Sequence, residues 1–314
     1  MTAIVDVKNL TKRFKETPVL RGLSFAVARG TVLGVLGPNG AGKTTAINCL
    51  TTLLTPDSGT AMIAGYSVTD QPESVRALIS LTGQFAAVDE ALTARENLIL
   101  FGRLLRLSGA AAKRRADELL MQFELTAAAN RQVKTFSGGM RRRLDLAASI
   151  VVLPLVLFLD EPTTGLDPRS RQQLWSVVKD LKAKGITIIL TTQYLEEADA
   201  LADQIIVIDQ GQVIAEGTAD ELKDKVGGKR CELRLAHKDD VPKVRMLLAD
   251  IGEITLGEMG EDGPIAIAAP EGAKTLTEIV LRLESKNIPL ADISLRRPSL
   301  DDVFFALTGH TTKD

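Results

Sequence analysis

The fold of this chain is decided by one stretch, Gly37-Pro38-Asn39-Gly40-Ala41-Gly42-Lys43-Thr44-Thr45. It fits the phosphate-binding loop G-x-x-x-x-G-K-[ST] and stands between an apolar strand predicted over 32–36 and a helical run over 46–50. The glycines let backbone N–H groups converge on phosphate oxygens, Lys43 adds a positive charge at the outer phosphates, and the Thr44 hydroxyl is placed to ligate magnesium. The strand and the helix on either side argue against an accidental glycine-rich turn.

Two carboxylates end a second apolar run, Leu155-Val156-Leu157-Phe158-Leu159-Asp160-Glu161. A buried strand of this kind delivers Asp160 to a metal, while Glu161, one residue on, can face an attacking water. Many buried strands end in an acidic turn, so this prediction depends on the phosphate-binding loop upstream.

Length and composition limit the class of protein. A chain of 314 residues exceeds the usual span of one hydrophobic core and predicts a large domain plus a smaller one. With 38 basic and 40 acidic residues, the net charge of −2 lacks the footprint of a nucleic-acid-binding protein, so no nucleic-acid partner is expected. The two cysteines, Cys49 and Cys231, predict buried thiols in a reducing compartment.

Two further features predict a protein that stays inside the cell and does not span a membrane. Residues 1–6 lack the basic stretch and apolar run of a secretory signal. The longest uncharged stretch, 146–159, is shorter than the ~18 residues that a spanning helix needs, and it contains Pro154.

Short β-branched runs alternate with helical patterns up to about residue 225, which predicts an α/β domain. Residues 89–150 are instead rich in Ala and Leu with dense charge, and predict an inserted helical subdomain. Strands are predicted over 4–7, 23–27, 32–36, 186–190 and 205–209.

Beyond residue 224 the pattern changes to a strand, a helix, two strands, a helix and a strand, which is the split β-α-β-β-α-β pattern of ferredoxin-like domains. No residue of this part is a candidate catalytic group. Leu300, Val303, Phe304 and Leu307 then fall on one face of a helix that Ser299 can cap. The predicted strands lie near 231–235, 253–256, 265–267 and 293–295, and the predicted helices near 241–248 and 276–283.

The segment Ser137-Gly138-Gly139-Met140 separates one family from other phosphate-loop proteins, and with it the sequence resembles the ATP-binding cassette (ABC) family. In that family the segment follows a helical subdomain and opens a helix. A serine hydroxyl, flexible glycine backbone and a helix N-terminus suit a γ-phosphate, and the resemblance implies that the phosphate belongs to the nucleotide of a partner subunit. Met140 replaces the usual Gln and leaves the Ser and Gly groups intact.

Other segments of the family occur in the expected order. By resemblance, Gln84 contacts magnesium and senses the membrane partner, Asp167 bridges subunits, and Phe14 stacks on adenine. A place in the hydrophobic core is an equal alternative for Phe14. The residues expected to bind ATP are thus Phe14, the phosphate-binding loop, Gln84, Ser137, Gly138, Gly139, Asp160 and Asp167, and those expected to hold Mg²⁺ are Thr44, Gln84 and Asp160.

Gln193 stands where the family commonly has a histidine that holds the γ-phosphate and orients the water. Neither His237 nor His310 can replace it by sequence position. A glutamine side chain can donate and accept a hydrogen bond but carries no positive charge, so slow turnover or a flat pH response is expected.

A closer resemblance covers nearly the whole chain and is to ABC drug exporters of the daunorubicin/doxorubicin-resistance type, in which Gln at this position is familiar. It implies an α/β P-loop NTPase core with an antiparallel β subdomain and the helical subdomain, within a cassette of residues 1–225, and a ferredoxin-like accessory domain over 226–314. A separate multi-pass permease is the implied partner, with the cassettes peripheral on the cytoplasmic face of the cell membrane. The resemblance rests on runs 83–90, 137–145, 192–199 and 296–304.

The predicted function is ATP hydrolysis at two sites shared across a head-to-tail homodimer, coupled to export of a drug or other hydrophobic compound. Glu161 activates or orients the water, Lys43 and magnesium stabilise charge on the phosphoryl group, and Gln193 positions the water.

Two other classes share part of this pattern. A soluble ABC ATPase of translation or DNA repair would typically add a second cassette, a coiled coil or a basic surface. A GTPase would share only the phosphate-binding loop, would need an Asn-Lys-x-Asp segment that this sequence lacks, and would leave Ser137 without a role.

Overall fold

The computed structural model describes residues 3–83, 87–225, 229–252, 254–256 and 265–308. They divide into two compact units, one ending at Thr218 and the other beginning at Ala219. The expected boundary near residue 225 lies later than this division, because helix α8 (Ala219–Lys225) packs against α11 (Leu300–Thr308) of the second unit. No helix among the described residues combines the length and apolar character needed to cross a bilayer.

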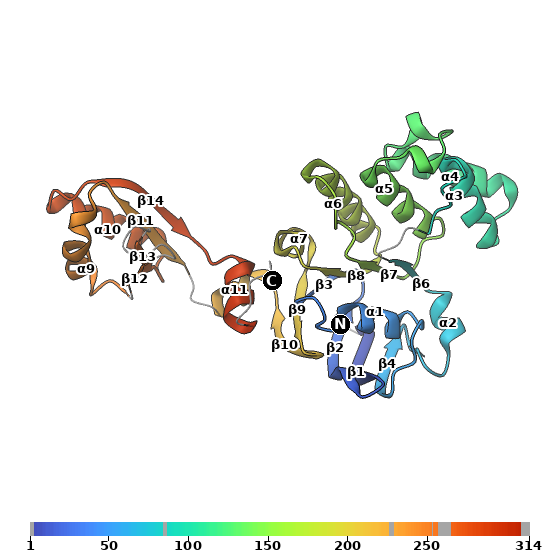
Figure 1. Ribbon diagram of the computed structural model, residues 1–314, viewed down its shortest axis with the longest axis horizontal. Coiled ribbons are helices and arrows are strands. Elements are labelled where there is room, and N and C mark those ends of the chain that lie inside the picture. The colour runs from blue at the N-terminus through green and yellow to red at the C-terminus, as the bar shows by residue number, and fades with distance from the viewer. Residues whose placement is uncertain (1–2, 84–86, 226–228, 253, 257–264, 309–314) are drawn as a thin grey trace. The chain divides into compact units, whose positions relative to one another are not determined.

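A six-stranded sheet forms the centre of the first unit (Figure 1). Its strand order is β10-β9-β3-β8-β7-β6; all neighbours are parallel except β10, which pairs antiparallel with β9 at the edge. The predicted strands at 32–36, 186–190 and 205–209 are therefore confirmed. The bounds are β3 (Val32–Leu36), β6 (Ile79–Thr82), β7 (Val156–Asp160), β8 (Thr187–Thr192), β9 (Gln204–Asp209) and β10 (Gln212–Gly217).

Helices cover one face of this sheet, and the predicted helical subdomain is among them. Leu157 and Leu159 of β7 join the apolar side chains of these helices in one core. The first helix of the subdomain, α3, begins at a capping box in which Thr93 and Glu96 satisfy each other's backbone N–H groups. The bounds are α3 (Ala94–Leu104), α4 (Gly109–Gln122), α5 (Gly138–Ser149), α6 (Pro168–Ala183) and α7 (Leu195–Leu201), with short 3₁₀ turns at Thr126–Ala128 and Val133–Thr135.

An antiparallel sheet of order β2-β1-β4-β5 and helix α1 cover the other face. Val156 and Phe158 of β7 point to this side, so residues alternate between two cores along one strand. Cys49 is buried on α1, as predicted, and burial raises the pKa of its thiol to about 11. The bounds are β1 (Ala3–Phe14), β2 (Thr17–Ala28), α1 (Lys43–Leu50), β4 (Ser58–Ile63), β5 (Tyr66–Ser67) and α2 (Pro72–Arg76).

The second unit has the predicted ferredoxin-like topology, an antiparallel sheet of order β12-β13-β11-β14 with two helices between its strands. Its core holds the second buried cysteine, Cys231. Ser299 caps α11 as expected, accepting from the Asp302 N–H at 3.1 Å. Glu253, predicted to start a strand, lies outside the described residues. The bounds are β11 (Arg230–Leu235), α9 (Val241–Leu248), β12 (Ile254–Leu256), β13 (Ile265–Ala268), α10 (Ala273–Ser285) and β14 (Leu290–Arg296).

Because the two units have separate cores, we expect a fragment ending at Thr218 to fold by itself, with one cooperative thermal transition by circular dichroism. A fragment ending at Lys225 should fold too but bind more hydrophobic dye, since Leu222 is buried in the whole chain. A fragment ending at Thr192 is the control and should not fold, because β9 pairs with the central strand β3. A missing transition in the first fragment would contradict the separate cores.

Candidate functional site

The predicted phosphate-binding loop connects the buried strand β3 to helix α1. Gly37 has to be a glycine because a Cβ atom there would lie 2.2 Å from the carbonyl oxygen of Ile208. Gly42, with a φ of 106°, is the last residue before α1, which begins at Lys43. The N–H groups of the first helical turn, which lack partners within the helix, therefore face the loop, as in helix-terminal anion sites.

The Lys43 ammonium lies across this loop. Its Nζ atom donates to the carbonyl oxygens of Gly37 at 2.7 Å and Pro38 at 3.1 Å, and the residue is 5% exposed. Burial lowers the pKa of Lys43, and the negative charges of Glu161 and Asp160 act in the opposite direction. A cation is thus held among acceptors at the place where outer phosphates are expected.

Asp160 reaches the same edge of the sheet as the last residue of β7, and it is 3% exposed. Two hydroxyl groups face its Oδ1 atom. Thr191 Oγ1, on the paired residue of β8, donates to it at 2.5 Å, and Thr44 Oγ1 of α1 lies at 3.4 Å. The carboxylate and the Thr44 hydroxyl are therefore neighbours, as the sequence predicts.

Glu161 follows with a φ of 47°, a conformation that is rare for a residue with a side chain. Its N–H donates to Thr191, at 3.1 Å to the carbonyl oxygen and at 3.0 Å to Oγ1, while its Oε2 accepts from the Thr164 hydroxyl at 3.2 Å. This turn brings Glu161 to a cavity of about 320 Å³ that it shares with the phosphate-binding loop. The cavity is lined by Val19, Asn39, Gly40, Gly42, Lys43, Thr44, Thr45 and Glu161.

Ser137 caps helix α5, and its Oγ accepts from the Met140 N–H at 3.2 Å. Ser137 and Gly138 are exposed, and neither lines the cavity around Lys43. Gly139 is buried, and a Cβ atom there would lie 2.6 Å from Ser170 Oγ on α6. The predicted second anion site is thus an exposed helix N-terminus that presents its first residues to the outside of this chain.

Asp167 caps helix α6 in the same manner. Its Oδ1 accepts from the Ser170 N–H at 2.9 Å and its Oδ2 from the Ser170 hydroxyl at 2.7 Å. These hydrogen bonds lower the pKa of the Asp167 carboxyl. The side chain is therefore held at the start of α6, on an exposed surface.

The remaining predicted residues have different outcomes. Gln193 follows β8 directly, at the edge where Asp160 ends β7, but it does not line the cavity. Phe14 is 46% exposed at the end of β1, which excludes the core alternative, and it does not line the cavity either. Gln84 lies outside the described residues.

Sequence reasoning assigned no role to three residues that the structure brings to this site: Val19, Thr191 and Arg142. Val19 is one of many apolar strand residues, so nothing in the sequence around it indicates a place at the cavity. Thr191 stands in a recognisable segment, but its contact with Asp160 joins residues 31 positions apart. Arg142 has a sequence signal, because Asp145 stands one helical turn later and ion-pairs with it at 3.7 Å.

Comparisons with known proteins identify the relatives of this chain. The ABC transporter family matches residues 20–164. The daunorubicin resistance ATP-binding protein DrrA2 of Streptomyces coeruleorubidus is 52% identical, covering 99% of this chain and 96% of that protein. The doxorubicin resistance ATP-binding protein DrrA of Mycobacterium tuberculosis is 53% identical, covering 100% and 95%. A solved dimeric ATP-binding cassette in a post-hydrolysis state, bound to ADP and Pi, has a TM-score of 0.63 at 27% identity and covers 68% of this chain and 98% of that one.

Fold and site together define a nucleotide-binding ATPase built on a phosphate-binding loop. The chain belongs to the ABC transporter family, in which it is an ATP-binding and ATP-hydrolysing subunit. The resemblance to drug-resistance ATP-binding subunits is thereby confirmed. The alternative of an ATPase in translation or DNA repair has no support in these relatives.

We expect Thr191→Val to slow ATP hydrolysis and to cost about 1–3 kcal/mol of folding stability, because a buried hydroxyl bond to Asp160 is lost. Thr191→Ser keeps the hydroxyl and should hydrolyse ATP nearly as the parent does. Thr187→Val is the matched control, since it removes a buried hydroxyl that accepts from the Gly30 N–H at 2.9 Å at the other end of β8. Steady-state ATPase rates and thermal unfolding decide: equal rates in Thr191→Val and Thr187→Val would contradict this role.

Proposed function

We propose that this chain hydrolyses ATP with Glu161 as the residue that activates or orients the attacking water. The supporting observation is that Glu161, Lys43 and Thr44 line one cavity, with the buried Asp160 beside Thr44. Lys43 compensates charge on the outer phosphates, and the N–H groups from Gly40 to Thr45 bind phosphate oxygens. A carboxylate within reach of the water and a cation at the phosphoryl group are the parts that phosphoryl transfer needs.

Magnesium is the metal that these residues suit. The Thr44 hydroxyl and the Asp160 carboxylate are hard oxygen donors 3.4 Å apart, and Mg²⁺ in nucleotide sites takes one or two protein oxygens together with phosphates and water. Thr44 and Asp160 would hold the ion, with Gln84 as a third ligand. When bound, Mg²⁺ supplies neutralisation of phosphate charge.

A second copy of the chain completes each site in this proposal. Ser137 and Gly138 present an exposed helix N-terminus that lies outside the cavity of their own chain, and such an end favours an anion. In a head-to-tail dimer this end would face the γ-phosphate held by the partner. The solved dimeric cassette bound to ADP and Pi is a relative in which two such chains associate.

Three residues take supporting roles in the proposal. Gln193, which directly follows β8 at the edge where Asp160 ends β7, orients the water through its amide, which can both donate and accept. Phe14, whose ring is exposed, stacks on adenine. Asp167, fixed as the cap of α6, contacts the partner subunit.

We further propose that the subunit drives export of a drug or other hydrophobic compound. This is supported by two relatives that are named for daunorubicin and doxorubicin resistance and that are identical to this chain at about half of all residues. A separate multi-pass permease then carries the compound, and two copies of this chain sit peripherally on the cytoplasmic face of the cell membrane. Residues 1–225 act as the cassette and residues 226–314 as an accessory domain.

Replacing Glu161 with Gln keeps the size of the side chain and removes its charge. We expect ATP still to bind while hydrolysis falls by roughly 10²–10⁴-fold, and an ATP-stabilised dimer to accumulate in sedimentation. Glu284→Gln, on the exposed face of α10, is the control and should change neither quantity. Turnover by Glu161→Gln at the parental rate would show that the base is another group.

Ser137→Arg tests the shared site. A bulky cation at the exposed N-terminus of α5 should block dimer closure and hydrolysis but spare ATP binding by the monomer. Ser108→Arg is the matched control: Ser108 caps α4 with the same bond, to the Ala111 N–H at 3.2 Å, so both variants lose a cap worth about 0.5–2 kcal/mol. If Ser137→Arg hydrolysed ATP as Ser108→Arg does, the two-chain site would be wrong.

A further inference from the structure

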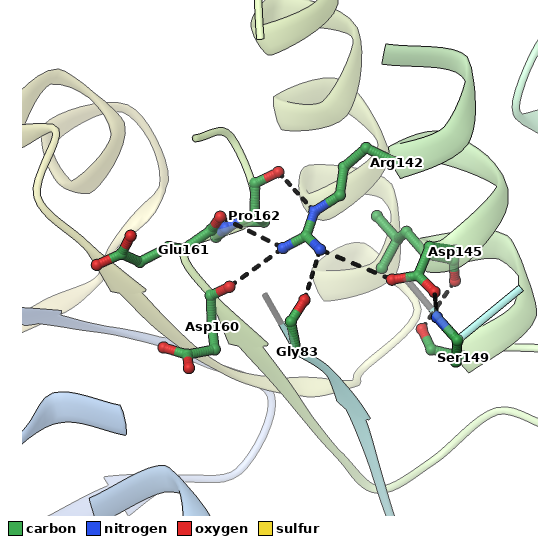
Figure 2. Close-up of polar contacts among 9 residues, drawn as sticks. Gly83, Arg142, Asp145, Ser149, Asp160, Glu161 and Pro162 are labelled. Carbon is green, nitrogen blue, oxygen red and sulfur yellow. Dashed lines mark hydrogen bonds and ion pairs between the residues drawn. The ribbon is translucent and has the colours of Figure 1, made fainter. Parts of the chain in front are cut away.

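Arg142, on helix α5, extends its side chain into the interior of the first unit, where it is 12% exposed. Every hydrogen bond it makes there reaches a main-chain oxygen. Figure 2 shows the guanidinium among these oxygens, while the carboxylates of Asp160 and Glu161 point away from it. The distances are 2.6 Å to Gly83, 2.8 Å to Pro162, 3.1 Å to Asp160 and 3.3 Å to Glu161.

A buried cation needs a counter-charge, and Asp145 provides it one helical turn along α5. The two side chains form an ion pair at 3.7 Å, and Asp145 also accepts from the Ala87 N–H at 2.7 Å. Burial lowers the pKa of Arg142 and raises that of Asp145; the hydrogen bond from the Ala87 N–H and the charge of Arg142 both act against the shift of Asp145. Removing one partner alone would leave an uncompensated buried charge.

The arrangement uses the geometry of an arginine. A guanidinium has five N–H donors in a rigid planar fork and can serve several carbonyl oxygens at once. A lysine could keep the charge opposite Asp145, but its point-like ammonium could not span oxygens on both Gly83 and Pro162. The charge of residue 142 and its planar set of donors therefore have separate roles: the charge pairs with Asp145, and the planar donors bind the carbonyl oxygens.

Three of the four carbonyl oxygens that Arg142 holds belong to the turn that carries Glu161. Glu161 has a φ of 47°, and such a conformation is costly in free energy for a residue with a side chain, so the contacts that hold this turn matter. Thr191 holds this turn from the side of β8, through the Glu161 N–H. Arg142 holds it from α5, through the three successive carbonyl oxygens of residues 160–162.

We propose that Arg142 is a positioning residue for hydrolysis, which fixes the turn at 160–162 so that Glu161 faces the nucleotide cavity. The same side chain ties this turn to α5, whose first residues form the exposed anion site, and to Gly83, which directly follows β6. A shift of α5 or of Gly83 is thereby transmitted to the catalytic turn through a single guanidinium. The inference rests on the proposal that Glu161 acts on the water.

The first test separates turnover from ATP binding. Arg142→Gln combined with Asp145→Asn leaves no unpaired buried charge; we expect kcat to fall roughly 10- to 100-fold, as misplacement of a catalytic group does, with ATP affinity within about two-fold. Arg142→Lys keeps the positive charge opposite Asp145, so it should keep the thermal stability of the parent but lose kcat as the paired variant does. Arg115→Gln is the control, because Arg115 also donates to two main-chain oxygens, those of Ile150 and Val151 at 3.0 Å, away from the site.

The second test is a double-mutant cycle with Glu161→Gln. If Arg142 acts through Glu161, adding the paired change Arg142→Gln and Asp145→Asn to Glu161→Gln should slow the residual turnover by less than about two-fold. Equal slowing in both backgrounds would overturn the proposal, as would full turnover by Arg142→Lys or a loss of kcat in Arg115→Gln as large as in the Arg142 variants. The rate of Glu161→Gln alone tests the role of Glu161 separately.

Discussion

The contact between the Thr191 hydroxyl and the Asp160 carboxylate is the constraint around which this site is arranged. Asp160 is 3% exposed, and a buried carboxylate needs donors. Thr191 Oγ1 donates to Asp160 at 2.5 Å and accepts from the Glu161 N–H at 3.0 Å, so one hydroxyl sets the positions of two successive acidic residues. The contact depends on the parallel pairing of β7 with β8, which places Asp160 opposite Thr191 in a sheet that is covered on both faces.

Different kinds of group surround that contact on its two sides. Toward the phosphate-binding loop the groups are charged side chains, with the buried Lys43 ammonium near both carboxylates. Toward the helical subdomain they are main-chain oxygens gathered by Arg142. The turn at 160–162 therefore has its acidic side chains directed at the phosphate-binding loop and its main-chain oxygens directed at Arg142 of α5.

The parts of the site that consist of neighbouring residues in the sequence can be predicted from it. The contacts between residues far apart in the sequence cannot. The phosphate-binding loop is contiguous, so the nine residues 37–45 together predict the turn, the anion site, and the strand and helix on either side. Asp160 and Glu161 were identified because an apolar strand ends in two acids downstream of that loop. Arg142 and Gly83 are 59 positions apart, and no local pattern announces their contact. The division between the two units falls before the boundary expected near residue 225 for the same reason. The sequence of α8 is a charged continuation of the cassette, and its packing on α11 depends on residues far along the chain.

The burial of Cys49 on α1 has a practical consequence. With a pKa of about 11, only about one thiol in ten thousand is ionised at pH 7, and the thiolate is the form that reacts. Cys231 is buried as well and its pKa is raised by burial, so the folded chain is nearly inert to maleimides. A fluorophore or spin label can therefore be attached at an introduced surface cysteine without removing either native one. Slow labelling of Cys49 itself would then report the opening of the core directly beneath the phosphate-binding helix, without any change to the sequence.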